Sequence, residues 1–168
     1  MKTLSIIRHA KAETAADSIS DFARALTERG HKDAHALAKV IDSLKPKVEW
    51  IVSSNAKRAM QTAQDLVKVL GDAPTLVLEE RIYGADVATL LSVLAEIPSG
   101  IEHAALVGHN PTLEELTCGL CSGVNHPVSV TLATATLARV ELELFAWDQI
   151  RWGCGRLHLL LPAKVLRS

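Results

Sequence analysis

The chain has 168 residues, which suits a single domain over 1–168 with a sizeable core. Apolar residues make up 48% of it, which excludes a disordered chain, and a net charge of -1 at pH 7 argues against a general nucleic-acid binder. Three cysteines, an odd number, favour a reducing compartment over a disulfide framework. Because apolar runs are shorter than a signal peptide or a membrane span requires, we expect a cytoplasmic protein outside the membrane.

Predicted strands and helices alternate along most of the chain. Short apolar runs predict strands, and apolar positions at helical spacing predict helices. In chain order the predicted elements are a strand over 3–9, a helix over 26–44, a strand over 48–54, a helix over 55–71, a strand over 75–80, a helix over 87–96, a strand over 103–109, a helix starting at 110–111, and closing strands over 133–144 and 155–161. We expect the last two to form a hairpin.

Residues typical of helix ends support these boundaries. Thr27 and Asp86 precede two of the predicted helices and can cap them, and Gly71 is a stop signal for a third. Asn110 followed by Pro111 predicts a helix start, with a capping side chain and then proline at the first helical position.

Alternating strands and helices predict an α/β fold, a three-layer α/β/α sandwich with a mainly parallel central sheet. In such a sheet the ligand crevice lies beyond the carboxyl ends of the strands. Polar or ionisable residues end four of the predicted strands: Arg8 and His9, Ser53 and Ser54, Glu79 and Glu80, and His109. The sequence therefore predicts a functional site at one edge of the sheet.

Three stretches at that edge carry a family resemblance. "RHA" after the first strand, "SSNAKRAMQTA" after the second and "VGHN" after the fourth resemble the histidine phosphatase superfamily. The nearest branch is the SixA-like phosphohistidine phosphatases, to which "LTERGHKDA" is also similar. The resemblance covers roughly residues 3–122 and implies a phosphoglycerate mutase-like fold.

The resemblance also implies roles for individual residues. His9 matches the nucleophile that forms a phosphohistidine intermediate, Arg8 and Arg58 match the phosphate-binding arginines, and His109 matches the second histidine of the pocket. It implies no metal ion and no other cofactor. These residue types suit phosphoryl transfer, because guanidinium groups can hold several phosphoryl oxygens and nearby cations keep an imidazole nucleophile uncharged.

One position departs from the family pattern, and another matches a family residue without a single clear candidate. The residue after the nucleophile is usually glycine but here is Ala10, a change that still leaves a backbone carbonyl able to orient the His9 ring. Glu80, in "EERIYGAD", matches the general acid of mutase-like relatives, with Glu79 and Asp86 as weaker substitutes. A structural role, in which the glutamate caps or pairs with Arg81, is an equal alternative.

We therefore predict a metal-independent phosphatase that acts through His9 on a phosphohistidine-bearing protein. The alternatives are a broad phosphomonoesterase acting on small molecules, a phosphate-binding module without turnover, and, more weakly, a mutase. The chain has no long insertion to cover the pocket, which favours an open site over a mutase's enclosed one.

A cysteine pair raises the alternative of a zinc site. Cys118 and Cys121 are spaced CxxC, with His126 shortly after them and Cys154 further along. The pair falls in an apolar predicted helix, so buried small side chains are the better interpretation.

Overall fold

A computed structural model describes residues 1–15, 19–71, 74–122 and 128–167. A single six-stranded sheet, in the order β3-β2-β4-β1-β5-β6, forms the centre of these residues. Its strands are β1 (Lys2–Arg8), β2 (Trp50–Ser54), β3 (Thr75–Glu79), β4 (His103–Gly108), β5 (Thr136–Leu142) and β6 (Gly155–Pro162). The first four are mutually parallel, and β5 and β6 add an antiparallel hairpin, so the predicted fold class is confirmed.

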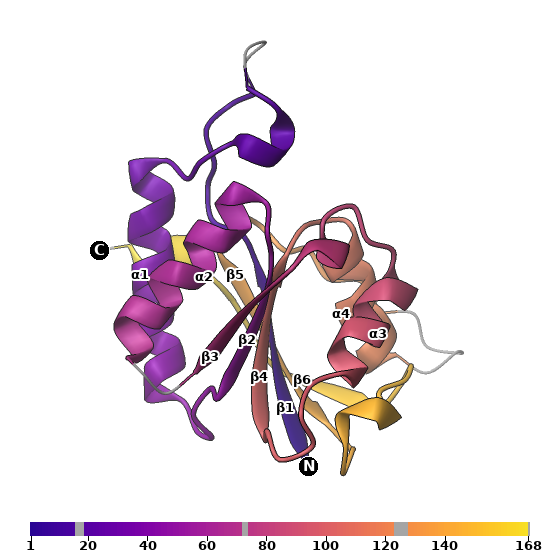
Figure 1. Cartoon of the computed structure of the whole chain (residues 1–168). Coiled ribbons are helices and arrows are strands. Elements are labelled where there is room, and N and C mark those ends of the chain that lie inside the picture. The colour runs from indigo at the N-terminus through magenta and orange to yellow at the C-terminus, as the bar shows by residue number, and fades with distance from the viewer. Residues whose placement is uncertain (16–18, 72–73, 123–127, 168) are drawn as a thin grey trace.

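Helices cover both faces of the sheet (Figure 1). The α-helices are α1 (Glu28–Ser43), α2 (Lys57–Leu70), α3 (Val87–Ala95) and α4 (Thr112–Cys121). Short 3-10 helices are η1 (Asp21–Ala23), η2 (Glu80–Ile82), η3 (Trp147–Gln149) and η4 (Ala163–Leu166). Helices α1 and α2 lie on one face and α3 and α4 on the other, which gives the expected three layers.

An apolar core fills the space between the sheet and each of the two helix layers. The core under α1 and α2 includes Leu37, Ile41 and Leu66 packed on β-strand residues, all at most 1% exposed. The core under α3 and α4 is larger and includes Leu94 and Trp147. Burial of the apolar faces of both sheet and helices is the main source of stability for such an arrangement.

Three of the four expected helix-end signals are confirmed. Thr27 accepts a hydrogen bond from the backbone N–H of Gly30, Asp86 accepts one from that of Thr89, and Gly71 ends α2 with φ 74°. The expectation for Asn110 is wrong, because its side chain makes no capping bond and α4 begins at Thr112 after Pro111.

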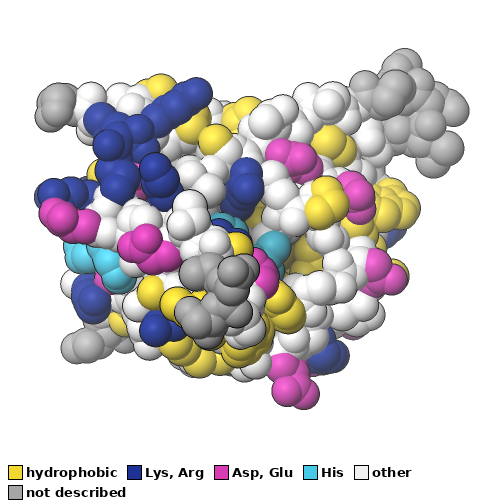
Figure 2. All heavy atoms as spheres, turned by 90° about the horizontal axis from the view of Figure 1, so that it is seen from above, with side chains coloured by type: hydrophobic (Ala, Val, Ile, Leu, Met, Phe, Trp, Pro, Cys, Tyr) yellow, Lys and Arg dark blue, Asp and Glu magenta, His cyan; other side chains and the backbone are white. Residues whose placement is uncertain are grey.

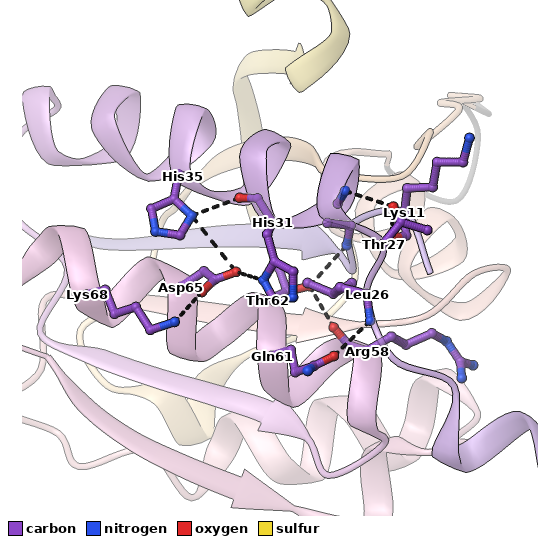
Figure 3. A network of polar contacts seen from close by, with 12 residues as sticks. Lys11, Leu26, Thr27, His31, His35, Arg58, Gln61, Thr62, Asp65 and Lys68 are labelled. Atoms are coloured by element: carbon purple, nitrogen blue, oxygen red, sulfur yellow. Dashed lines mark hydrogen bonds and ion pairs between the residues drawn. The ribbon is translucent and has the colours of Figure 1, made fainter. Parts of the chain in front are cut away.

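Polar contacts tie α1, α2 and the segment before α1 together (Figure 3). The carboxylate of Asp65 on α2 is buried and bonds Nδ1 of His31 on α1 (2.5 Å) and Nζ of Lys68 (2.7 Å). The backbone N–H of Leu26 donates to Oε1 of Gln61 on α2 (2.7 Å). The chain between β1 and α1 is therefore anchored to α2 just before α1 starts.

The strand order brings the ends of three strands together. Strand β4 lies between β1 and β2, and the register pairs Arg8 with Gly108 and Ser53 with Val107. The residues that follow these strand ends therefore share one small region of the sheet edge, while β3 ends at the outside of the sheet. Among the described helices, none has both the length and the apolar character needed to cross a membrane.

Candidate active site

His9 follows β1 and is held by hydrogen bonds to both ring nitrogens. Its Nδ1–H donates to the carbonyl of Ala10 (2.8 Å), and its Nε2 accepts from Nε–H of Arg58 (3.1 Å). A carbonyl only accepts and a guanidinium only donates, so both bonds select the same neutral tautomer, with a lone pair on Nε2. Ala10 thus supplies the orienting carbonyl, and its own N–H donates to Oγ1 of Thr62 (3.0 Å).

The surroundings of His9 favour its uncharged form. The side chain is 8% exposed, and burial, followed by the nearby charges of Arg58 and Arg8, lowers its pKa to about 4 despite the hydrogen bond to Ala10. Burial removes the water that would solvate an imidazolium, and neighbouring cations repel it. His9 therefore carries a free electron pair at neutral pH.

Arg58 comes from the first turn of α2 and has a second partner opposite His9. Its Nη1 donates to the backbone carbonyl of Asp21 (2.6 Å) and its Nη2 to Oδ2 of the same residue (3.0 Å). Burial opposes ionisation of Asp21, but hydrogen bonds from Tyr83, Arg24 and Arg58 outweigh it and lower its pKa to about 2. The carboxylate is therefore charged at neutral pH and forms an ion pair with Arg58.

His109 follows β4 and faces His9, with ring centroids 5.3 Å apart. Its Nε2 bonds Oγ of Ser54 at the end of β2 (2.9 Å), and its Nδ1 has no hydrogen-bond partner among the described residues. Burial, then the charges on His9 and Arg58, lowers its pKa to about 3. The ring of Tyr83 meets it edge-on at 5.6 Å.

Arg8 ends β1 and turns toward the loop before β5. Its Nη1 donates to the carbonyl of Leu132 (2.7 Å), which also accepts from Nδ2 of Asn110 (2.9 Å). The second acceptor of Asn110 is Oε1 of Glu114 (2.7 Å), so this side chain braces the site instead of capping α4. The Nε of Arg8 is buried and has no partner in the described part of the chain.

Glu79 at the end of β3 and Glu80 just after it lie apart from these groups. Glu79 accepts hydrogen bonds from the backbone and side chain of Arg81, which also pairs with Glu96. Glu80 is exposed at the start of η2. The structure thus assigns the predicted pairing with Arg81 to Glu79, and it does not place Glu80 beside His9 or His109.

A cleft of about 490 Å³ opens beside Arg58 and His109. Apart from those two and Asn110, it is lined mostly by apolar groups from the end of η2, the segment after it, α3 and the region where α4 begins: Ile82, Tyr83, Gly84, Ala85, Leu90, Pro111, Thr112 and Leu113. Figure 2 looks onto this end of the molecule and shows histidine side chains in a central hollow beside basic and acidic ones. A larger hollow of about 710 Å³ lies along α1 and includes no strand end.

The cysteines of the zinc alternative are free thiols. Burial, together with the neighbouring Cys118 and Cys154, raises the pKa of Cys121 to about 11, as expected for a buried thiol among apolar groups. No group of three metal-binding side chains occurs within 1–15, 19–71, 74–122 and 128–167, and His126 lies outside the described residues.

The structure thus brings together Arg8, His9, Arg58 and His109, and it adds residues that sequence reasoning missed. Asp21 has no sequence signal, since it lies in a loop with no periodicity. Tyr83 belongs to the "EERIYGAD" stretch, in which the acidic residues, and not the tyrosine, predict a functional role. Their contacts with Arg58 and His109 depend on loops that meet only in the folded chain.

Comparisons with known proteins show what the chain is similar to. A family model described as histidine phosphatase superfamily (branch 1) matches residues 4–85. The phosphohistidine phosphatase SixA of Escherichia coli is 28% identical over 147 residues, covering 85% of this chain and 90% of that protein. An uncharacterised protein of Mycobacterium tuberculosis is 29% identical over 157 residues, covering 90% and 96%.

Solved structures share the fold. The protein histidine phosphatase SixA complexed with tungstate matches with a TM-score of 0.82 at 22% identity, over 98% of this chain and 99% of that one. A mycobacterial glucosyl-3-phosphoglycerate phosphatase matches with a TM-score of 0.71 at 19% identity, over 95% and 98%. The chain is similar to members of the histidine phosphatase superfamily, SixA-like ones among them, and it is a phosphatase.

Proposed function

We propose that this phosphatase acts on phosphohistidine in proteins, without a metal ion, and through a covalent intermediate on His9. The observation that carries the proposal is the neutral His9 ring, whose Nε2 lone pair lies in contact with Arg58. The similarity to the Escherichia coli phosphohistidine phosphatase SixA supports the choice of substrate.

In the first step, Nε2 of His9 attacks phosphorus and the bond from phosphorus to the substrate imidazole breaks. The electron pair stays on the substrate nitrogen, and because the other ring nitrogen carries a proton, the leaving group departs as neutral imidazole. Arg58 gives up its contact with Nε2 and donates instead to phosphoryl oxygens, together with Arg8, whose buried Nε has no described partner. In the second step, water attacks phosphorus, His9 regains its electron pair and inorganic phosphate leaves. Stabilisation of the equatorial oxygens is the main catalytic requirement of such transfers.

In this proposal His109 binds the phosphoryl group together with the two arginines. Its Nε2 is occupied by Ser54, which leaves Nδ1 for a phosphoryl oxygen. The low pKa of His109 applies to the pocket without substrate. A phosphoryl dianion between His109 and the arginines offsets their repulsion and favours protonation of His109.

Glu80 has no required part in hydrolysis of phosphohistidine. Imidazole is a far weaker base than an alkoxide, so its departure needs less help from a general acid. The exposed position of Glu80 is compatible with a site that acts on such a leaving group. The apolar cleft beside Arg58 and His109 has room for a ring-shaped leaving group.

The decisive experiment incubates the protein with a ³²P-phosphohistidine protein and, separately, with a panel of alkyl and aryl monoesters, all in excess chelator. We expect label to be trapped on wild-type protein in acid-sensitive form and phosphohistidine to be hydrolysed fastest. Faster hydrolysis of small monoesters would assign the broad phosphomonoesterase instead, and binding without turnover would assign the phosphate-binding module. Loss of activity in chelator would mean that hydrolysis depends on a metal ion.

A further inference from the structure

One residue outside the predicted site holds the guanidinium of Arg58 at its far end. Asp21 accepts from Nη1 through its backbone carbonyl and from Nη2 through Oδ2, at 2.6 and 3.0 Å. A guanidinium is a planar fork whose donors keep a fixed relation to one another. Fixing both terminal nitrogens therefore fixes the direction of the remaining edge, formed by Nε and the second N–H of Nη2.

That remaining edge is directed toward His9. The Nε–H of Arg58 lies 3.1 Å from Nε2 of His9, the atom proposed to attack phosphorus. A phosphoryl group attached to Nε2 would lie on the same side and could accept from Nε–H and Nη2–H together, in the side-by-side geometry that arginine forms with phosphate.

The carboxylate of Asp21 is itself fixed by two other side chains. Tyr83 donates its hydroxyl proton to Oδ2 (2.9 Å), and Arg24 donates from Nη1 to Oδ1 (2.7 Å). The ring of Tyr83 also packs edge-on against Phe22 (5.0 Å) and His109 (5.6 Å). Asp21 thus links Arg58 to Tyr83, the side chain that contacts His109.

We propose that Asp21 is a positioning residue, which holds the terminal nitrogens of Arg58 so that its Nε edge faces the phosphoryl group on His9. The inference rests on the proposed function. It goes beyond that function because it assigns to the loop between β1 and α1 a part in orienting the phosphate ligand.

The segment that carries Asp21 has anchors of its own. The N–H of Glu13 donates to the carbonyl of Ala25 (2.9 Å), and that of Leu26 donates to Gln61 on α2 (2.7 Å; Figure 3). These backbone bonds do not involve the Asp21 side chain. Replacing that side chain should therefore release Nη2 of Arg58, while the segment and the bond from Nη1 to the backbone carbonyl of residue 21 are kept.

The test compares Asp21→Ala, Asp21→Asn and, as a matched control on the same segment, Glu13→Ala, which removes an exposed carboxylate. We expect Asp21→Ala to lower kcat for p-nitrophenyl phosphate roughly tenfold to a hundredfold, the loss typical of a displaced catalytic group. The Kd of inorganic phosphate should change less than about threefold, because both arginines keep their charge. Asp21→Asn should recover most of kcat, since its amide oxygen still accepts from Nη2.

A second measurement separates positioning from a general structural effect. In an Arg58→Lys background the fork is absent, so Asp21→Ala should cost less than about threefold in kcat. Unchanged kcat in Asp21→Ala, tighter phosphate binding with no loss of kcat, or the same loss in both backgrounds would each overturn the inference.

Failure of the proposed function is distinguishable from failure of this inference. A wild-type protein without turnover and without trapped phosphate contradicts the function alone. In that case the Nε–H proton NMR signal of Arg58 still tests positioning: we expect a slowly exchanging signal in wild type and Glu13→Ala, and fast exchange in Asp21→Ala. Equal exchange in all three would overturn the positioning role.

Discussion

The centre and the outer part of the same sheet edge contain similar ionisable residues in different surroundings. At the centre, Arg58 pairs with Asp21 at 3.0 Å and its side chain is 8% exposed. Beyond the edge strand β3, Arg81 pairs with Glu79 at 2.8 Å and its side chain is 41% exposed. The ion pairs have nearly the same geometry, yet only the central arginine contacts a histidine with a strongly lowered pKa.

Strand order explains this difference. Strands β1, β4 and β2 are neighbours, whereas β3 lies three strand spacings from β1, roughly 14 Å away. Central strand ends are surrounded by chain on both sides, which removes water and strengthens electrostatic interactions. The edge strand has one neighbour, so the side chain of Arg81 just beyond it remains partly in solvent, where ion pairs contribute little. We therefore expect the reaction to take place at the ends of the central strands β1, β4 and β2.

The largest effect should come from removing the proposed nucleophile at the centre. We expect His9→Ala to lower phosphohistidine hydrolysis by about a thousandfold or more and to abolish trapping of ³²P, because no covalent intermediate can form. The control is His158→Ala, a half-exposed histidine on β6, which should keep full activity. Turnover retained in His9→Ala would discard the covalent mechanism.

A direct comparison of the two arginines should give the next largest effect. Arg58→Ala should lower kcat/KM about a hundredfold to a thousandfold, since it removes charge and oriented donors from the transition state. Arg81→Ala removes an arginine with a similar ion pair at the edge and should lower it less than about threefold. Equal losses in the two variants would contradict the contrast between centre and edge.

Acid should affect the buried histidines in a predictable direction. The pKa values of His9 and His103 are each lowered to about 4, from an ordinary value near 6.5, with burial as the main cause. The unfolded chain therefore binds protons before the folded one, so the free energy of unfolding should decrease as pH falls from 6.5 through 4. NMR of the His9 ring should show the neutral form down to about pH 5.

His103 provides the control for that pH dependence. It is buried in β4 and bonds Ser5 and the carbonyl of Pro46, far from the phosphate groups of the proposal. His103→Gln should weaken the dependence of unfolding on pH between 6.5 and 4 while the pH dependence of the His9 NMR signal is kept. An unchanged unfolding profile would assign the acid sensitivity to other groups.

The smallest effect is expected for Glu80, which follows the edge strand β3. Glu80→Gln should lower hydrolysis less than about threefold on phosphohistidine and on alkyl phosphates, because this exposed side chain does not line the cleft. A loss above about tenfold that is confined to alkyl phosphates would restore Glu80 as a general acid.

Local patterns in the sequence determined the elements and their ends. Apolar runs and helical spacing predicted six strands and four α-helices, and Thr27, Asp86 and Gly71 marked helix ends through bonds with residues close in sequence. Asn110 failed as a cap because its amide bonds Leu132 and Glu114, and the contact with Leu132 exists only after folding.

The sequence also indicated which residues would reach the sheet edge, since Arg8, His9 and His109 directly follow strands. It could not indicate which of the strand ends would be buried together, because strand order is a property of the whole sheet. Only the tertiary structure separated Glu80 from the central residues and brought Asp21 and Tyr83 to Arg58 and His109. Those contacts join loops distant in sequence, and no local pattern encodes them.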